Sequence, residues 1–268
     1  MAGRFFDVSP SYGGSGLGEA LMYEAMFAET VRITGHQGDT IDAYAARPFG
    51  GGPYPAVVVV HHAPGWDEAT KEITRKLAHH GYVGVSPNLH HREGPGTPSE
   101  NSATVRAAGG VPDDRCMGDI KGAMAYIRGL PYHNGKIGII GFCSGGRQTF
   151  IAACSVPGLD AAVDCWGGRV IAKPAEITER QPVSPITLAP RMQAPLLGIF
   201  GNDDASPDPD QVNKIEAELQ RLDKVHEFHR YDGAGHGFFA VDRPNYRPVQ
   251  ATDAWGKVFA WYEKYLRG

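Results

Sequence analysis

The chain has 268 residues, of which 42% are hydrophobic and 21% charged, a composition typical of soluble globular proteins. Its 26 basic and 30 acidic residues leave a formal net charge of -4, which gives no electrostatic reason to expect nucleic acid or an anionic membrane as a partner. No stretch approaches the roughly 20 apolar residues of a membrane span, and the N-terminus lacks a signal-peptide pattern. We therefore expect a cytoplasmic protein whose four cysteines are reduced.

The first 28 residues contain a run of glycine, serine and proline, and we interpret them as an N-terminal arm. Whether this arm serves in dimerisation, covers the site or does neither is left open by the sequence. Residues 29–268 contain no linker and are predicted to form a single α/β domain. At its start, residues 30–34 and 40–47 nearly alternate polar and apolar side chains around a glycine turn, which predicts an antiparallel hairpin.

The rest of the domain alternates between strand and helix patterns. Residues 55–60 include a continuous β-branched run, which predicts a strand buried on both faces of a parallel sheet. Residues 67–80 repeat apolar side chains at helical spacing, and Gly81 stands where a helix C-cap is expected. The same reasoning predicts strands at 82–86, 136–141, 159–165, 195–200 and 225–231, and helices at 113–129, 145–154, 210–222 and 249–266.

Two stretches rich in proline and other turn-forming residues interrupt this alternation. Residues 87–112 and 167–193 are predicted to be mostly irregular, and the second is a candidate to fold over a ligand site. Strands alternating with helices predict an α/β protein with a mostly parallel sheet of about eight strands, covered by helices on both faces. In such sheets ligands bind beyond the carboxyl ends of the strands. Reactive side chains at those ends are therefore candidates for a functional site.

A cysteine directly follows one of these strands, in the stretch Gly141-Phe142-Cys143-Ser144-Gly145. The pattern G-x-C-x-G is a nucleophile elbow with sulfur in place of the more usual hydroxyl. Such a sharp turn needs glycine on both sides, because a Cβ there would collide with the neighbouring backbone. We therefore predict that Cys143 is a nucleophile, with an ordinary buried thiol as the alternative. The other cysteines are predicted to be core residues: Cys116, Cys154 and Cys165.

A thiol attacks a carbonyl carbon as the thiolate and therefore needs a base. Two later strands end in candidates, His236 for the base and the adjacent Asp203 and Asp204 for the carboxylate that orients it. We prefer Asp204, which stands three residues after the glycine of its loop. The chain order nucleophile, acid, histidine is that of α/β-hydrolases. The backbone N–H groups of Ser144 and Ala63 are the predicted oxyanion hole.

Three motifs together resemble those of the dienelactone hydrolase family, the carboxymethylenebutenolidases. They are Gly-Phe-Cys-Ser-Gly-Gly at 141–146, Gly-Asn-Asp-Asp at 201–204 and Gly-Ala-Gly-His-Gly-Phe at 233–238. The resemblance extends over residues 30–266 and implies an α/β-hydrolase fold with a cysteine-aspartate-histidine triad. It also implies hydrolysis of a small ester or lactone through a thioester intermediate, without cofactor or metal.

Two positions depart from the family pattern, and both concern charge. Where the family has a glutamate that takes part in activating the cysteine, this chain has His62. Where the family has an arginine that holds the substrate carboxylate, four residues after the catalytic histidine, this chain has Ala240, with Arg243 close by in sequence. The class of hydrolase is therefore better supported than dienelactone as its substrate.

Candidate residues of the substrate pocket are His62, Trp66, Trp166 and Phe238. For His62 the alternative is a structural role, and the aromatic residues would belong to the core if they face away from the site. Further candidates to hold a carboxylate, unless they are solvated or structurally paired, are Arg92, Arg106, Arg147 and Arg169. Several histidines occur as adjacent pairs, which lack the spacing of a metal site, so no metal is expected.

The sequence thus predicts a hydrolase that uses Cys143, Asp204 and His236 on a small ester or lactone. Acyl transfer or thioester hydrolysis by the same three residues is one alternative. A non-catalytic protein that binds a small molecule is another, because the acidic neighbour of the thiol is missing. The natural substrate and the formation of a homo-oligomer are left open.

Overall fold

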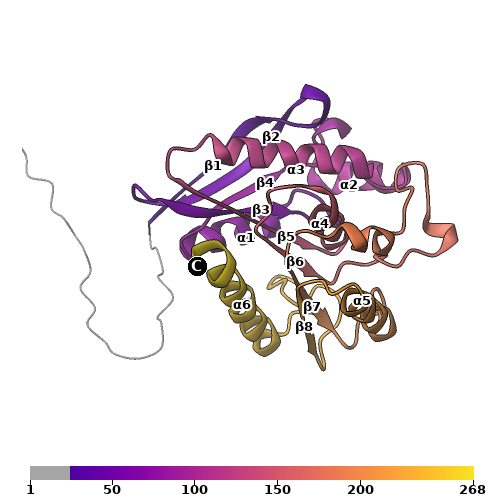
Figure 1. Cartoon of the computed structure of the whole chain (residues 1–268). Helices are drawn as coiled ribbons and strands as arrows, with labels where there is room; N and C mark the ends of the chain where they lie inside the picture. Colours follow the sequence, from indigo (N-terminus) through magenta and orange to yellow (C-terminus); the bar gives the residue numbers. More distant parts are fainter. Residues whose placement is uncertain (1–24) are drawn as a thin grey trace, which may run out of the picture.

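A computed structural model describes residues 25–268 and shows one eight-stranded sheet with helices on both sides (Figure 1). The strand order is β1-β2-β4-β3-β5-β6-β7-β8. Strand β2 pairs antiparallel with β1 and β4, and every pair from β4 to β8 is parallel. The mostly parallel sheet of eight strands is therefore confirmed. The predicted arm, residues 1–28, lies almost entirely outside the described residues.

The elements follow the predicted ones closely. The strands are β1 Met26–Thr34, β2 Thr40–Pro48, β3 Tyr54–Val60, β4 Val83–Pro87, β5 His133–Phe142, β6 Ala161–Cys165, β7 Leu196–Gly201 and β8 His226–Tyr231. The α-helices are α1 Glu68–His79, α2 Pro98–Ala107, α3 Asp113–Arg128, α4 Ser144–Ser155, α5 Pro209–Arg221 and α6 Pro248–Tyr262. Short 3-10 segments span His36–Gly38, His91–Glu93, Pro174–Glu176 and Pro185–Arg191, and a π turn spans Glu263–Arg267.

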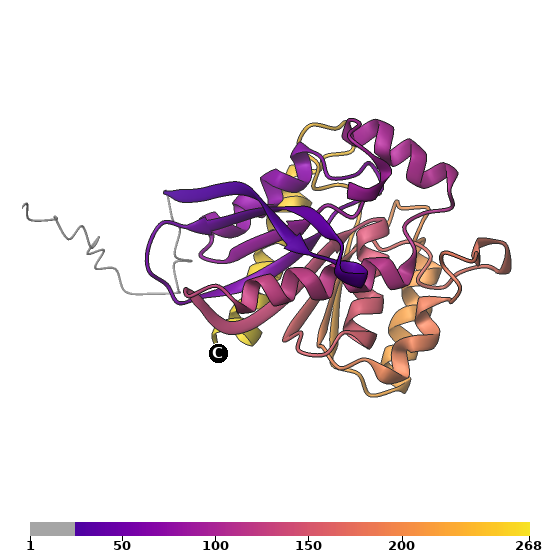
Figure 2. The ribbon, with the colours of Figure 1, turned by 90° about the horizontal axis from the view of Figure 1, so that it is seen from above.

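The central strand β3 shows why the sheet needs helices on both faces. All seven of its residues are buried. Val58 and Val60 belong to a core with side chains of α3, α4 and α5, whereas Val57 and Val59 belong to a second core with α1 and α6. Because successive side chains of a strand point to opposite faces, a continuous apolar run supplies both cores. The two helical layers are seen on either side of the sheet in Figure 2.

The prediction that residues 87–112 are mostly irregular was wrong for α2. This helix begins with a capping box, in which the Thr97 hydroxyl accepts from the Glu100 N–H and the Glu100 carboxylate accepts from the Thr97 N–H at 2.7 Å. Pro98 occupies the first helical position. The stretch Thr-Pro-Ser-Glu carries both start signals, and the weak apolar periodicity behind it concealed the helix.

The stretch 167–193 is mostly irregular, as predicted, but it does not fold over a ligand site. Its segment Pro185–Arg191 packs against α4, and Gln193 donates its N–H to the carbonyl of Ala153 on that helix at 3.0 Å. No residue of this stretch lines the cavity beside Cys143 that is described below. Its prolines serve a surface connection between β6 and β7.

Within residues 25–268, none of the helices combines the length and the apolar character that a membrane crossing requires.

Candidate active site

Cys143 lies at the turn between β5 and α4, with φ 54 and ψ -117. This region of φ is uncommon for residues other than glycine and marks a strained backbone. The flanking glycines are required by packing. A Cβ on Gly141 would lie 2.1 Å from the carbonyl oxygen of Gly145, and a Cβ on Gly145 would lie 2.3 Å from that of Val60. The elbow therefore has the close packing that the G-x-C-x-G pattern predicts.

His236 and Asp204 meet at the carboxyl ends of the neighbouring strands. The Nδ1–H of His236 donates to Oδ2 of Asp204 at 2.8 Å, and Oδ1 of Asp204 accepts from the backbone N–H of Ser206 at 2.8 Å. Asp204 is only 7% exposed, whereas the adjacent Asp203 is exposed. Oδ1 of Asp204 thus holds the side chain in place, while Oδ2 orients the imidazole. Of the two candidate aspartates, Asp204 is the one that contacts His236.

The thiol of Cys143 and the imidazole of His236 form a hydrogen-bonded pair. Burial would raise the pKa of the thiol, but the hydrogen bond and positive charge of His236, together with the backbone N–H groups of Ser144 and Ala63, lower it overall. Burial would lower the pKa of His236, but its bonds to Asp204 and Cys143 raise that pKa to about 10. The pair therefore favours the thiolate and the imidazolium over a pH range that begins below the ordinary pKa of a thiol.

Helix α2 reaches the loop that carries Ala63. The Ser102 hydroxyl donates to the carbonyl oxygen of Ala63 at 2.7 Å, and Ser102 is 1% exposed. The N–H of Ala63, which hydrogen-bonds to the Cys143 sulfur, belongs to the preceding peptide, so the bond from Ser102 holds Ala63 from its carbonyl side. Sequence reasoning missed Ser102 because it lies in the stretch that was interpreted as irregular; the capping box at Thr97 was the signal that could have revealed it.

His62 is paired with a carboxylate. Its Nε2–H donates to Oδ2 of Asp67 at 2.7 Å, and Oδ1 of Asp67 caps α1 by accepting from the N–H of Thr70 at 3.1 Å. Burial would raise the pKa of Asp67, but the bonds from His62 and Thr70 lower it to about 2. Arg243 lies with Nη2 3.9 Å from the same carboxylate. A negative charge is therefore present near the position of the family glutamate, supplied by Asp67 behind His62.

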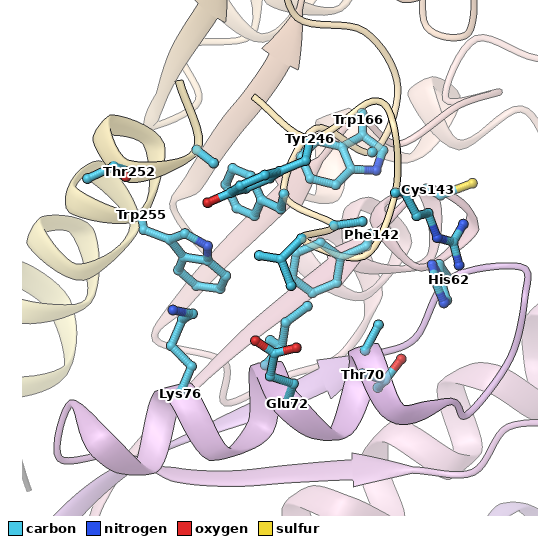
Figure 3. Close-up of a pocket in the computed structure, with 18 of the residues that line it drawn as sticks. His62, Thr70, Glu72, Lys76, Phe142, Cys143, Trp166, Tyr246, Thr252 and Trp255 are labelled. Atoms are coloured by element: carbon cyan, nitrogen blue, oxygen red, sulfur yellow. The ribbon is translucent and has the colours of Figure 1, made fainter. Parts of the chain in front are cut away.

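A cavity of about 950 Å³ opens beside Cys143 and His236. Figure 3 shows Cys143 and His62 at one end, and Lys76 and Trp255 toward the other. Of the predicted pocket residues, His62 and Trp166 line this cavity. Trp66 and Phe238 do not: the indole N–H of Trp66 donates to the Ser86 carbonyl at 3.0 Å, and Phe238 is fully buried in the core.

Residues 237–246 and α6 supply the cavity walls that sequence reasoning missed. Phe239, which follows Phe238, lines the cavity, as does Arg243. Asn245 ties this segment to the site by donating to the backbone carbonyl of His236. The run Gly-Phe-Phe in the sequence did not reveal which of the two rings faces the cavity and which packs in the core, because the segment is neither helix nor strand.

The four arginines proposed as carboxylate anchors do not line the cavity. Arg147 is buried and forms an ion pair with Asp113. Arg92 contacts Asp119 at 2.9 Å and Asp39 at 2.6 Å. The arginines that do line the cavity are Arg243 and Arg267. In the described part of the chain, residues 25–268, no three histidine, cysteine, aspartate or glutamate side chains gather as metal ligands would.

An eight-stranded, mostly parallel sheet with a nucleophile elbow after β5 defines an α/β-hydrolase. Comparison with family models places residues 41–266 in the dienelactone hydrolase family. Because the match covers most of the chain, the protein belongs to this family of hydrolases, and the resemblance inferred from the three motifs is confirmed.

Similar proteins include one from Methylorubrum extorquens named "Putative carboxymethylenebutenolidase", which is 32% identical over 243 residues covering 90% of this chain and 82% of that protein. Another, from Bradyrhizobium, is named "Probable 2-oxo-3-(5-oxofuran-2-ylidene)propanoate lactonase" and is 30% identical over 91% of this chain and 98% of its own length. Among solved structures, the "Putative Dienelactone Hydrolase" of Klebsiella pneumoniae superposes with a TM-score of 0.82 at 31% identity. The superposition covers 90% of this chain and all of that one.

Proposed function

We propose that this protein hydrolyses small esters or lactones with Cys143 as nucleophile, His236 as general base and acid, and Asp204 as the residue that orients His236. The observation that carries the proposal is the placement of His236, which contacts Asp204 through Nδ1 and the Cys143 thiol on its other side. This leaves one imidazole nitrogen free to exchange protons with sulfur and substrate.

The reaction proceeds in two halves. The Cys143 thiolate attacks the carbonyl carbon, a C–S bond forms, and the negative charge on the carbonyl oxygen is stabilised by the N–H groups of Ser144 and Ala63. The C–O bond of the ester then breaks, and His236 gives its proton to the leaving alkoxide. In the second half His236 takes a proton from water, the hydroxide attacks the thioester, and the carboxylic acid departs as the thiolate returns.

The substrate class follows from the family and from the lactonase among its relatives. A lactone is an ester whose acid and alcohol remain joined, so the same two halves open its ring. Acyl transfer to another acceptor and thioester hydrolysis share the first half. They would be distinguished by supplying an alcohol or amine acceptor, or a thioester, in place of the ester and water.

We expect p-nitrophenyl acetate to give a burst of p-nitrophenol equivalent to one acetyl group per Cys143, followed by slower turnover. Cys143→Ala should abolish both phases, because the other three cysteines are buried. Cys154→Ala is the matched control, since Cys154 is a buried thiol on the same helix α4, and it should keep the burst. Turnover that persists unchanged in Cys143→Ala would refute the mechanism. Absence of both burst and turnover in the folded wild-type chain would favour the non-catalytic alternative.

A further inference from the structure

The cavity continues far beyond Cys143, in the space between α1 and α6. Its lining includes residues of α1 and its C-cap from Ala69 to His80, and residues of α6 from Ala251 to Ala260. At 1.5 Å per residue, the stretch from Ala69 to His80 is about 16 Å long. The volume of about 950 Å³ stands at the upper end of the range of about 300–1,000 Å³ that holds drug-sized ligands. A single five-membered lactone would fill only the end near Cys143.

A row of rings lines the length of this space. It starts beside the imidazole of His236, whose ring centroid is 6.4 Å from that of Trp166. Successive centroids along the row lie 5.0, 4.9, 5.6 and 3.8 Å apart, in the order Trp166, Phe239, Trp255, Phe259 and His80. All five rings line the cavity. We call this set the aromatic row.

The outer members of the aromatic row are incompletely covered by the protein itself. Trp255 and Phe259 are only partly buried, although large apolar side chains are stabilised by removal from water. A continuous apolar surface left open to a cavity indicates a ligand that completes its burial. Because the row is made of flat rings, it suits a flat or extended apolar group, which stacks on aromatic faces.

The charges around the space cancel. Its cationic lining residues are Lys76, Arg243 and Arg267, and its anionic ones are Glu72, Asp242 and Glu263. One of the cations, Lys76, lies 5.6 Å from the ring of Trp255. With three charges of each sign, the lining has no net charge to select an ionised group along its length. The apolar contacts therefore decide what the space accepts.

We propose that the preferred substrates are esters or lactones that carry an extended apolar arm, and that this arm lies along the aromatic row between α1 and α6. The inference rests on the proposed function, because the reacting bond must lie at Cys143. It assigns the specificity of the enzyme to Trp255, Phe259 and the helix face that carries them, which lie apart from the reacting groups.

Gly256 offers a way to fill this space without touching the reacting groups. It lines the cavity, and a Cβ built on it would meet no heavy atom within 4 Å. Gly256→Trp should therefore place an indole in the space between α1 and α6, which we call the channel. Gly256→Ala is the matched control, because it also replaces glycine by a better helix former but without the bulk. Trp255→Ala removes one wall and adds nothing.

The esters to compare are methyl acetate, methyl 4-phenylbutanoate with the arm on the acyl side, and 4-phenylbutyl acetate with the arm on the alcohol side. In the wild type, we expect kcat/KM for one of the armed esters to exceed that for methyl acetate by about tenfold or more, from burial of the arm. Gly256→Trp and Trp255→Ala should remove this advantage through KM, and Gly256→Ala should retain it. The rate of hydrolysis is measured as the rate at which base must be added to keep the pH constant while acid is released.

The inference is overturned if neither armed ester is preferred, or if the preference survives either Gly256→Trp or Trp255→Ala. If the preference survives Gly256→Trp and this variant disrupts self-association in sedimentation experiments, the channel is an interface between copies of the chain. The p-nitrophenyl acetate burst, measured in each variant and in Cys143→Ala, reports on the proposed mechanism separately. A burst that depends on Cys143 together with no preference for armed esters would reject this inference alone.

Discussion

At the scale of single residues, the chemistry of the site depends on where one proton resides. The Cys143 thiol is partly buried, which by itself opposes ionisation, yet its pKa is lowered because His236 and two backbone N–H groups stabilise the thiolate. The pKa of His236 is raised to about 10. The thiolate-imidazolium pair therefore exists from the lowered pKa of the thiol up to about pH 10.

Alkylation by iodoacetamide tests this pair, because only the thiolate reacts. The pH midpoint of Cys143 labelling should lie below that of a free thiol, and His236→Ala should move it upward, because burial then acts without its counterion. At pH 7 we expect labelling of the His236→Ala variant to be about tenfold slower than labelling of the wild type. His229→Ala is the control, since His229 contacts Glu227 on β8 instead. A midpoint near that of a free thiol, unaffected by His236→Ala, would contradict the ion pair.

At the scale of elements, the site is assembled from strand ends and from one helix that braces a loop. Cys143, Asp204 and His236 follow strands whose carboxyl ends meet at one edge of the sheet. Ala63 follows β3 in the same way, but its loop is held from outside by α2 through Ser102. The position of Ala63, and with it the position of its N–H, therefore depends on how α2 packs against the loop.

Ser102→Ala should leave the protein folded, with a loss of about 1 kcal/mol for one hydrogen bond. We expect kcat for p-nitrophenyl acetate to fall more than KM rises, because the Ala63 N–H is a predicted oxyanion donor, and the midpoint of Cys143 labelling to rise. Thr104→Ala is the matched control: Thr104 is exposed on the same helix, where its hydroxyl bonds to the Glu100 carbonyl at 3.2 Å. If both variants lose stability but neither shifts the labelling midpoint, Ser102 has no positioning role.

At the scale of the whole molecule, the parallel sheet buries a carboxyl group beneath the elbow. Asp164 on β6 is 2% exposed, and its Oδ1 accepts from the Gly167 N–H at 2.8 Å. Burial raises the pKa of Asp164 to about 7, from an ordinary value of 3.8. Between these two values the unfolded chain releases a proton that the folded chain retains. The free energy of unfolding therefore falls as pH rises through this window.

Asp164→Asn keeps the acceptor for Gly167 but cannot ionise. Relative to the wild type, its free energy of unfolding should rise between about pH 4 and pH 7 and then level off. The rise is at most about 4 kcal/mol, which corresponds to the full difference between the pKa values of Asp164 in the folded and unfolded chains. Urea unfolding at a series of pH values measures this difference. A difference that does not change with pH would show that Asp164 is not held neutral in the fold.

Much of this protein could be predicted from its sequence because the relevant signals are local. The β-branched run 55–60, the apolar spacing of 67–80 and the glycines around Cys143 each reflect constraints within a few neighbouring residues, and the structure has these elements where they were expected. The strand-end rule then predicted the meeting of Cys143 and His236, because parallel strands bring their carboxyl ends to one edge.

Only the tertiary structure decided which side chains from distant segments face the thiol. The contact between Ser102 and Ala63, the pairing of His62 with Asp67, and the choice of Phe239 over Phe238 as a wall depend on how a helix or an irregular loop docks. The same holds for the channel, which exists because α1 and α6 lie side by side although about 170 residues separate them in the chain. Spacing in a sequence carries periodicity within an element, whereas a cavity is shaped by the distance between elements.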